Sequence, residues 1–213
     1  MCGRGRNRVD TATEAEPLVR RLKDGDRSVL GELFGLYREH LRRMVDLRLD
    51  SRLNGRIDTS DVLQDAYLDA MRRVDHFLKK PDMPFHVWLR LVAAQTIVDC
   101  HRQHLGAQMR DAGQEQRLEQ TVVPQASSVT LAKCLAAQFE SPSHAAMRHE
   151  VMTQVERALD SMDPLDREVL ALRHFEELTN DEVAAVLNLQ KSAASNRYVR
   201  ALRRLKEELA RIQ

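Results

Sequence analysis

Three segments in the first half of the chain carry apolar residues at the three-and-four spacing of a buried helix face. They are 28–49, 58–74 and 85–104. The second follows Asp58, a residue type that often caps the N-terminus of a helix. The third follows "KKPDMP", whose two prolines cannot lie in a helix interior and therefore indicate a turn. The pattern predicts one helical domain over residues 14–105.

The apolar periodicity weakens between residues 106 and 143. The segments "TVVPQASS" and "ESPS" predict turns there, although the apolar stretch "VTLAKCLAAQF" leaves room for a short helix. Helical periodicity returns from residue 144. We therefore predict an all-α protein of two helical domains, with a linker over 106–143 and a C-terminal domain over 144–213.

Within the C-terminal domain, "LTNDEVAAVLNLQKSAASNRYVRALRRL" predicts two helices separated by a tight turn. Thr179 and Glu182 have the T-x-x-E spacing of a capping box, which starts a helix. Asn188 tolerates a left-handed conformation, so we expect it to end that helix. A second helix is expected from about Lys191. Two helices joined in this way form a helix-turn-helix, which places its second helix in the major groove of DNA.

The second helix of this motif has an apolar face and a polar face. The inward positions are expected to be Ala194, Tyr198, Ala201, Leu202 and Leu205. The outward positions are expected to be Ser195, Asn196, Val199, Arg200 and Arg203. Arg200 can reach a guanine edge or a phosphate, while Lys191 and Arg197 can neutralise phosphates. The alternative is a helical hairpin whose basic face is merely solvated.

Composition supports the helical prediction, and the charge distribution supports the DNA-binding one. The chain has 43% apolar, 31% charged and 4% aromatic residues, which favours helices over a sheet sandwich. The net charge of +1 hides a reversal along the chain: residues 163–182 include seven acidic and two basic residues, and residues 190–213 include seven basic and two acidic residues. A basic second helix suits a nucleic-acid partner. The alternative is that the acidic run and the basic run are each merely a solvated helix face.

Several other functions are not expected. No stretch approaches the roughly 18 apolar residues of a membrane span, and "MCGRGRNRVD" lacks the apolar segment of a secretory signal, so we expect a cytoplasmic protein without membrane insertion. Cys2, Cys100 and Cys134 are widely spaced, which favours reduced thiols. The cluster "CHRQH" has no second ligand pair at zinc-site spacing, and no nucleotide-binding loop or nucleophile motif is present. We therefore expect no metal, no cofactor and no catalysis.

Both halves of the chain resemble one protein family. The stretch "ALDSMDPLDREVLALRHFEELTNDEVAAVLNLQKSAASNRYVRALRRL" resembles region 4, the C-terminal promoter-binding domain of bacterial sigma factors of the extracytoplasmic-function (ECF) group. Independently, "DTSDVLQDAYLDAMRRVDHF" resembles region 2.2, and "PFHVWLRLVAAQTIVDCHRQH" resembles regions 2.3 and 2.4. The resemblance implies a protein that binds core RNA polymerase, directs it to promoter DNA and opens the strands. An anti-sigma factor is kept open as a further partner.

The resemblance also implies roles for individual residues. The family's polymerase-binding positions correspond to Asp61, Gln64 and Asp65, which helical spacing places together on one exposed face. The positions near the downstream (minus-ten) promoter element correspond to Phe85, Gln95, Asp99 and Arg102. Phe85 is expected either to stack on an unpaired base or to belong to the core. Contacts to the upstream (minus-thirty-five) element are expected from Lys191, Ser195, Asn196, Arg197, Val199, Arg200 and Arg203.

One rival interpretation is a stand-alone transcription regulator that uses only the helix-turn-helix. That interpretation gives no role to "SDVLQDAYLDAMRR". The chain also departs from the family pattern, since Asn188 replaces the usual Gly at the turn and Gln190 replaces the usual Ser at the following cap. These departures leave the fold in place and leave the base preferences open.

Overall fold

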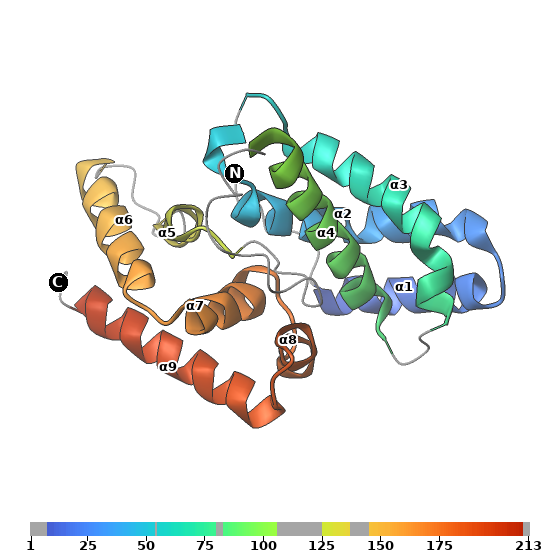
Figure 1. The fold of residues 1–213 in the computed structure, drawn as a ribbon. Coiled ribbons are helices and arrows are strands. Elements are labelled where there is room, and N and C mark those ends of the chain that lie inside the picture. Colours follow the sequence, from blue (N-terminus) through green and yellow to red (C-terminus); the bar gives the residue numbers. More distant parts are fainter. Residues whose placement is uncertain (1–7, 54, 80–82, 106–124, 137–144, 211–213) are drawn as a thin grey trace. The chain divides into compact units, whose positions relative to one another are not determined.

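The computed structural model describes residues 8–53, 55–79, 83–105, 125–136 and 145–210 (Figure 1). Regular structure within these ranges is entirely helical, which confirms the all-α prediction. The chain divides into two compact units, one within residues 4–124 and one that includes residues 125–213.

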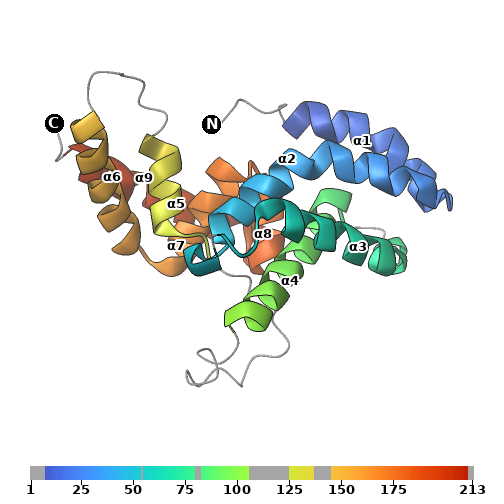
Figure 2. The same ribbon diagram turned by 90° about the horizontal axis from the view of Figure 1, so that it is seen from above.

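The N-terminal unit consists of α1 (Arg8–Lys23), α2 (Leu30–Arg48), α3 (Thr59–Leu78) and α4 (Phe85–Leu105), with the short 3₁₀ turns η1 (Arg27–Val29) and η2 (Ser51–Leu53). Helix α1 lies along α2, and α3 packs against both α2 and α4 (Figure 2). Asp58 caps α3 as predicted, because its carboxylate accepts hydrogen bonds from the backbone N–H groups of Ser60 and Asp61. The apolar faces of these helices meet in a core that includes Leu22, Leu33, Met44, Phe77, Leu89 and Ile97.

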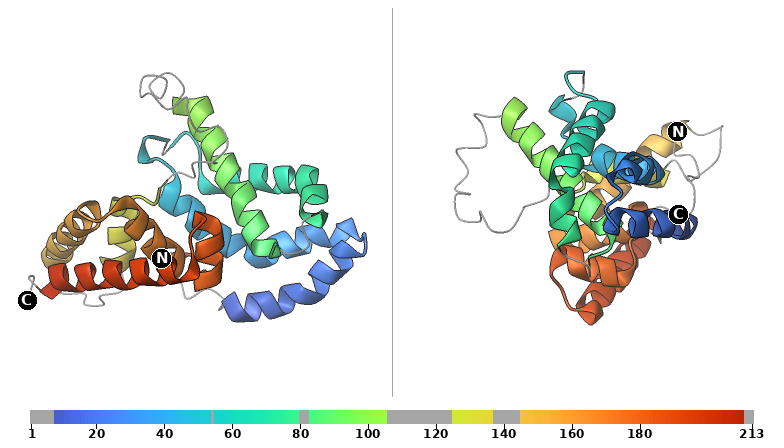
Figure 3. Two further views of the ribbon diagram at one scale, coloured as in Figure 1. Left: turned by 60° about the horizontal axis from the view of Figure 1, so that its bottom comes forward. Right: turned by 90° about the vertical axis from the view of Figure 1, so that its right-hand side faces the viewer.

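The C-terminal unit consists of α5 (Ser128–Ala136), α6 (Ala145–Asp160), α7 (Pro164–Leu170), the π-helical turn η4 (Ala171–Phe175), α8 (Asn180–Leu187) and α9 (Lys191–Ala210). Helix α5 packs against α6, and the long α9 lies along α6 and α7 (Figure 3). Helix α5 falls inside the predicted linker and belongs to the C-terminal unit. The reason is its apolar face, on which Leu131 and Ala132 are fully buried. Residues 106–124 and 137–143 of that linker lie outside the described residues.

In the described ranges, no helix has the length and apolarity that crossing a membrane requires. Neither Cys100 nor Cys134 forms a disulfide bond, and each is partly buried. Cys2 lies outside the described residues.

Candidate nucleic-acid interface

Helices α8 and α9 form the helix-turn-helix that the sequence predicted. The Thr179 hydroxyl accepts a hydrogen bond from the Glu182 N–H (3.3 Å), and the Glu182 carboxylate accepts one from the Thr179 N–H (2.7 Å), which completes the predicted capping box. Asn188 ends α8 in the left-handed conformation, with φ 51° and ψ 47°. The Asn180 amide donates to the backbone oxygen of Lys191 (2.8 Å), so the start of α8 is tied to the start of α9.

The inner side of the motif is an apolar cluster. Its buried members are Val169, Leu172, Leu178, Val183, Ala184 and Ala194. Leu189 and Tyr198 are partly buried and pack against it. The guanidinium carbon of Arg173 lies 5.0 Å from the centre of the Tyr198 ring, where the ring face attracts a cation. This cluster fixes one face of α9 and leaves the opposite face accessible.

The outer face of α9 is exposed as predicted. Its exposed residues include Ser195, Asn196, Val199, Arg200 and Arg203. The prediction for Leu202 was wrong: this side chain was expected to point inward, and the residue is 38% exposed. Ala201 and Leu205 are buried and already form the inward line. Leu202 follows Ala201 directly and is therefore rotated by about 100° around the helix axis, away from that line.

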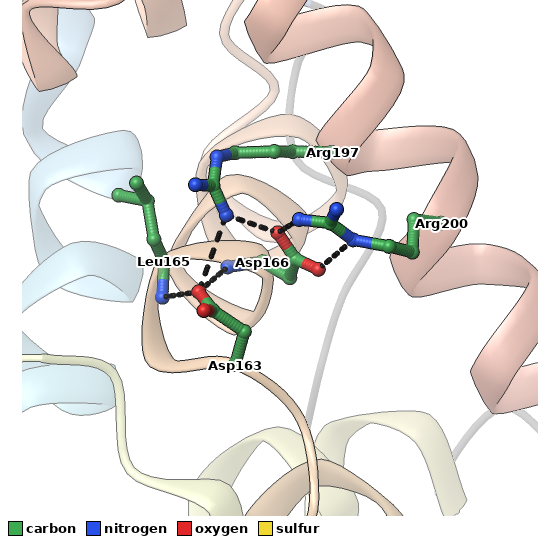
Figure 4. Close-up of polar contacts among 5 residues, drawn as sticks. All are labelled: Asp163, Leu165, Asp166, Arg197 and Arg200. Atoms are coloured by element: carbon green, nitrogen blue, oxygen red, sulfur yellow. Dashed lines mark hydrogen bonds and ion pairs between the residues drawn. The ribbon is translucent and has the colours of Figure 1, made fainter.

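Two arginines of α9 are held by carboxylates from the start of α7 (Figure 4). Both Nε and Nη2 of Arg200 donate to the carboxylate of Asp166, the Nη2 contact at 2.6 Å. Nη1 of Arg197 donates to Asp166 at 2.6 Å and to Asp163 at 3.2 Å. Asp163 is also the N-cap of α7, since it accepts from the backbone N–H groups of Leu165 (2.9 Å) and Asp166 (3.3 Å).

Asp166 is the buried centre of this network. Its side chain is 6% exposed, against 27% for Arg197 and 61% for Arg200. The hydrogen bonds from Arg200, helped by the one from Arg197, lower the pKa of Asp166 below its ordinary value, although burial acts in the opposite direction. The same pairing raises the pKa of Arg200. One ionised carboxylate is therefore shared by two guanidinium groups.

Asp163 and Asp166 were not among the predicted site residues. They were predicted only as members of an acidic run, and the reversal of that run to a basic one was the one signal available. The reversal does not say which acid meets which base, because Asp166 and Arg200 are 34 residues apart and come together only when α7 packs on α9.

Lys191 lies at the first position of α9. Its ammonium group is 2.7 Å from the Asp181 carboxylate, and the two side chains are 70% and 62% exposed. An ion pair this exposed contributes little free energy, because water screens both charges. Lys191 is therefore free to exchange this partner for a phosphate group at small cost.

The polymerase-binding positions taken from the family resemblance lie on α3. Asp61, Gln64 and Asp65 are all exposed, as helical spacing predicted. Asp61 has a second role, since its carboxylate accepts a hydrogen bond from the Asp58 N–H (3.1 Å) and completes a capping box at the start of α3. A substitution of Asp61 therefore changes the stability of the helix as well as the surface charge.

A groove runs between α3 and α4. It is lined by Ile57, Asp61, Val62, Asp65, Leu68, Asp69, Arg72, Thr96, Asp99, Cys100, Gln103 and His104. Four of these side chains are carboxylates and one is the exposed Leu68, at 40%. Asp99, assigned to DNA from the resemblance, thus shares a groove with Asp61 and Asp65, assigned to the polymerase.

Phe85 lies in the core of the N-terminal unit. It is 4% exposed, and its ring centre is 5.3 Å from that of Phe77 and 5.5 Å from that of Trp88. The structure therefore agrees with the interpretation of Phe85 as a core residue. An aromatic ring in this environment does not face solvent, where an unpaired base would have to meet it.

The other three minus-ten candidates form a row along α4. The Gln95 amide donates to the Asp99 carboxylate (3.0 Å), and the same carboxylate lies 3.9 Å from the Arg102 guanidinium. The side chains of Asp99 and Arg102 are 52% and 68% exposed. These polar groups are brought together on one accessible strip, separate from the buried Phe85.

His101, within the cluster that suggested metal ligands, has a structural role. Its Nε2 accepts a hydrogen bond from the backbone N–H of Asp50 (3.2 Å), which joins α4 to the segment after α2. Burial lowers the pKa of His101, and hydrogen bonds from Arg52 lower the pKa of Asp50 to about 2. In the ranges that the structure describes, no three His, Cys, Asp or Glu side chains gather to hold a metal ion.

Comparisons with known proteins match both units. The family models described as "Sigma-70 region 2" and "Sigma-70, region 4" match residues 36–105 and 158–207, together more than half of the chain. The RNA polymerase sigma-H factor of Pseudomonas aeruginosa is 24% identical over 191 residues, covering 90% of this chain and 91% of the relative. The ECF RNA polymerase sigma-E factor of Escherichia coli K12 is 26% identical over 193 residues, covering 86% and 88%.

One solved structure has a similar fold. It is that of CnrH in complex with the cytosolic domain of CnrY, with a TM-score of 0.52 and 22% sequence identity over 91% of this chain and 95% of that chain.

Two helical units that match regions 2 and 4 in this order, the second with a helix-turn-helix, define a sigma factor, and the chain belongs to the sigma-70 family. Within that family it is a sigma factor of the ECF group, as its relatives indicate. It is therefore not an enzyme, and it directs promoter recognition by RNA polymerase.

Proposed function

We propose that this sigma factor divides promoter recognition between its two units, with α9 contacting the minus-thirty-five element. The observation that carries the proposal is the exposed polar and basic face of α9, presented after a capped helix and a left-handed turn at Asn188. A helix presented in this way fits the major groove of B-DNA. The match of this unit to region 4 supports the same assignment.

Four residues of the outer face suit contacts with base edges. Arg200 can donate two parallel hydrogen bonds to a guanine, and Ser195 and Asn196 can donate to or accept from several bases. Val199, which is 44% exposed, offers an apolar contact to a thymine methyl group. Because these four side chains are neighbours on one helix face, they can meet consecutive base pairs.

Three basic residues suit phosphates. Lys191 and Arg203 are exposed at the first turn and further along α9. Arg197 is 27% exposed and already bonded to two carboxylates, so its contact with a phosphate would use donors that this pairing leaves open. Phosphate contacts orient the helix on DNA without sequence preference.

The N-terminal unit is proposed to bind core RNA polymerase through α3. The exposed Asp61, Gln64 and Asp65 suit a basic partner surface, since complementary charge guides association.

A protein that works on polymerase and promoter DNA acts in the cytoplasm. An anti-sigma factor is a further proposed partner, since the similar fold of CnrH was solved with the cytosolic domain of a second protein, CnrY.

The same unit is proposed to contact the minus-ten element with the polar row of α4. Gln95, Asp99 and Arg102 already lie on one strip, joined by the Gln95–Asp99 hydrogen bond and the Asp99–Arg102 ion pair. Phe85 can stack on an unpaired base only if its ring leaves the core that it occupies here. That step would accompany strand opening in the polymerase complex.

Run-off transcription with purified core polymerase, this protein and fragments of its own genome tests the function. We expect transcripts with defined starts that depend on the added protein. DNA binding without initiation would instead favour the stand-alone regulator. That alternative gives no role to the region 2 match or to the exposed acidic positions of α3.

A further inference from the structure

We propose that Asp166 is a positioning residue for sequence recognition, which holds Arg200 in the orientation that contacts the minus-thirty-five element. The proposal rests on the function proposed above for α9. Asp166 belongs to α7 and its side chain is only 6% exposed, so it acts through Arg200 and does not itself reach DNA.

The pairing leaves one edge of the Arg200 guanidinium open for a base. A guanidinium has five N–H donors in a rigid plane. Asp166 takes the edge formed by Nε and Nη2. The edge formed by Nη1 and the second hydrogen of Nη2 remains, and its two parallel N–H groups match the O6 and N7 acceptors of guanine. The side chain is 61% exposed on the outer face of α9, where DNA would lie.

Asp166 is itself held firmly enough to orient a long side chain. Arg197 donates to the same carboxylate from the preceding turn of α9 and also bonds Asp163, the N-cap of α7. An arginine without such a partner loses rotamer freedom when it binds a base. Arg200 has already lost much of that freedom in the unbound protein, which favours binding to the base that matches its orientation.

The charge of Asp166 separates this role from a general increase in affinity. A carboxylate close to the DNA-binding face opposes the attraction between basic residues and phosphates, so it weakens binding to every sequence. A side chain present only to strengthen DNA binding would not be acidic. Removal of this charge should therefore raise the affinity for DNA in general and lower the discrimination between sequences. Loss of a merely structural contact between α7 and α9 would not raise the affinity.

The test uses holoenzyme assembled from core polymerase and the full-length chain. Kd is measured for promoter fragments whose minus-thirty-five element is intact or scrambled, and the ratio of the two values is the discrimination. Asp166→Asn should lower the discrimination by about tenfold. The same variant should bind the scrambled fragment about two- to threefold more tightly, since one negative charge is gone.

Two comparisons isolate the pathway through Arg200. In the Arg200→Ala background, Asp166→Asn should leave the remaining discrimination unchanged, because the residue that it positions is absent. Asp160→Asn is the charge-matched control: Asp160 pairs with Arg167 at 3.4 Å and is 60% exposed. This control should retain the wild-type discrimination.

Circular dichroism melting shows whether each variant folds. If Asp166→Asn does not fold, Asp166→Glu replaces it, because it keeps the charge and moves the carboxylate by one methylene. Asp166→Glu should lower the discrimination without tightening binding to the scrambled fragment. Wild-type discrimination in the folded variant overturns the proposal, as does an undiminished effect in the Arg200→Ala background. A wild-type holoenzyme that does not discriminate between the fragments overturns the function proposed for α9 instead.

Discussion

Asp163 and Asp166 are three positions apart, yet their environments give them different roles. Asp163 is 53% exposed, caps α7 and accepts one hydrogen bond from Arg197. Asp166 is 6% exposed and bonds both arginines of α9. The buried carboxylate needs both partners, because an ionised group away from water is stable only when it is paired and hydrogen-bonded.

At the same scale, Lys191 and Arg200 should differ in how they affect DNA binding. Lys191→Ala should weaken binding to all sequences about equally and lower the slope of log affinity against log salt by about one unit, because a phosphate contact releases a counterion. The measurement is fluorescence anisotropy of holoenzyme on intact and scrambled elements across a salt series. Arg200→Ala is the comparison, with an expected loss of roughly 1–3 kcal/mol in the discrimination between the intact and the scrambled element. A loss of discrimination in Lys191→Ala would contradict the phosphate assignment.

His101 should make the N-terminal unit sensitive to mild acid. Its folded-state pKa lies below the ordinary value of 6.5, so the fold favours the neutral imidazole. Its stabilising contribution is present above about pH 6.5 and is lost as the pH falls through the lower folded-state pKa. His101→Gln keeps an acceptor for the Asp50 N–H but does not titrate.

Urea unfolding at pH 7.5 and pH 5.5 measures this effect. Trp88 is the single tryptophan of the chain and lies in the core of the N-terminal unit, so its fluorescence reports on that unit. Between the two pH values the wild type should lose more free energy of unfolding than His101→Gln. Equal losses in the two proteins would show that His101 is not the sensitive group.

At the scale of helices, α5 is part of the C-terminal fold. It packs against α6 and carries the buried Leu131, and Arg167 bonds Ser128 (3.0 Å) and Gln125 (3.2 Å) at the start of the segment. A fragment of residues 125–213 should therefore fold alone. The fragment 144–213 that the sequence suggested should melt roughly 10 °C lower, since burial of one leucine contributes about 2 kcal/mol. Coincident melting curves by circular dichroism would exclude this role for α5.

Features determined by neighbouring residues could be predicted from the sequence. The capping box of Thr179 and Glu182, the left-handed Asn188 and the cap of α3 by Asp58 were all predicted, because each depends on a few consecutive residues. Helical spacing also predicted the exposed face of α3. It misplaced Leu202, because periodicity does not show how wide a buried face is.

Features determined by packing could not be predicted in this way. Burial of Phe85 depends on Phe77 and Trp88, and the Asp166 network depends on α7 meeting α9. The extent of the linker also depends on packing, since α5 lies within the predicted linker and packs against α6. Sequence pattern shows that a face is apolar or charged, and the fold decides what meets it.

At the scale of the whole molecule, the polymerase contact should be removable without unfolding the chain. Asp65→Lys is the better substitution, because Asp61 also completes the capping box of α3 and its loss would destabilise the helix by about 1 kcal/mol. Asp65→Lys should weaken binding to core polymerase by at least tenfold (about 1.4 kcal/mol), since it sets like charges against a basic surface. Glu39→Lys is the control, because Glu39 is an exposed residue of α2 and the substitution makes the same change in charge. Unchanged affinity in Asp65→Lys would remove this surface from the interface.

We propose that the two units of this chain contact two promoter elements for one polymerase. Start-site mapping of run-off transcripts tests it most directly, with core polymerase, this protein and three templates: one promoter, and that promoter with either element scrambled. We expect one defined start on the intact promoter and a yield lower by more than about tenfold on each scrambled template, since each mismatched base pair costs about 1–3 kcal/mol. A yield that does not depend on either element, or DNA binding without any defined start, would show that the two units do not divide promoter recognition in this way.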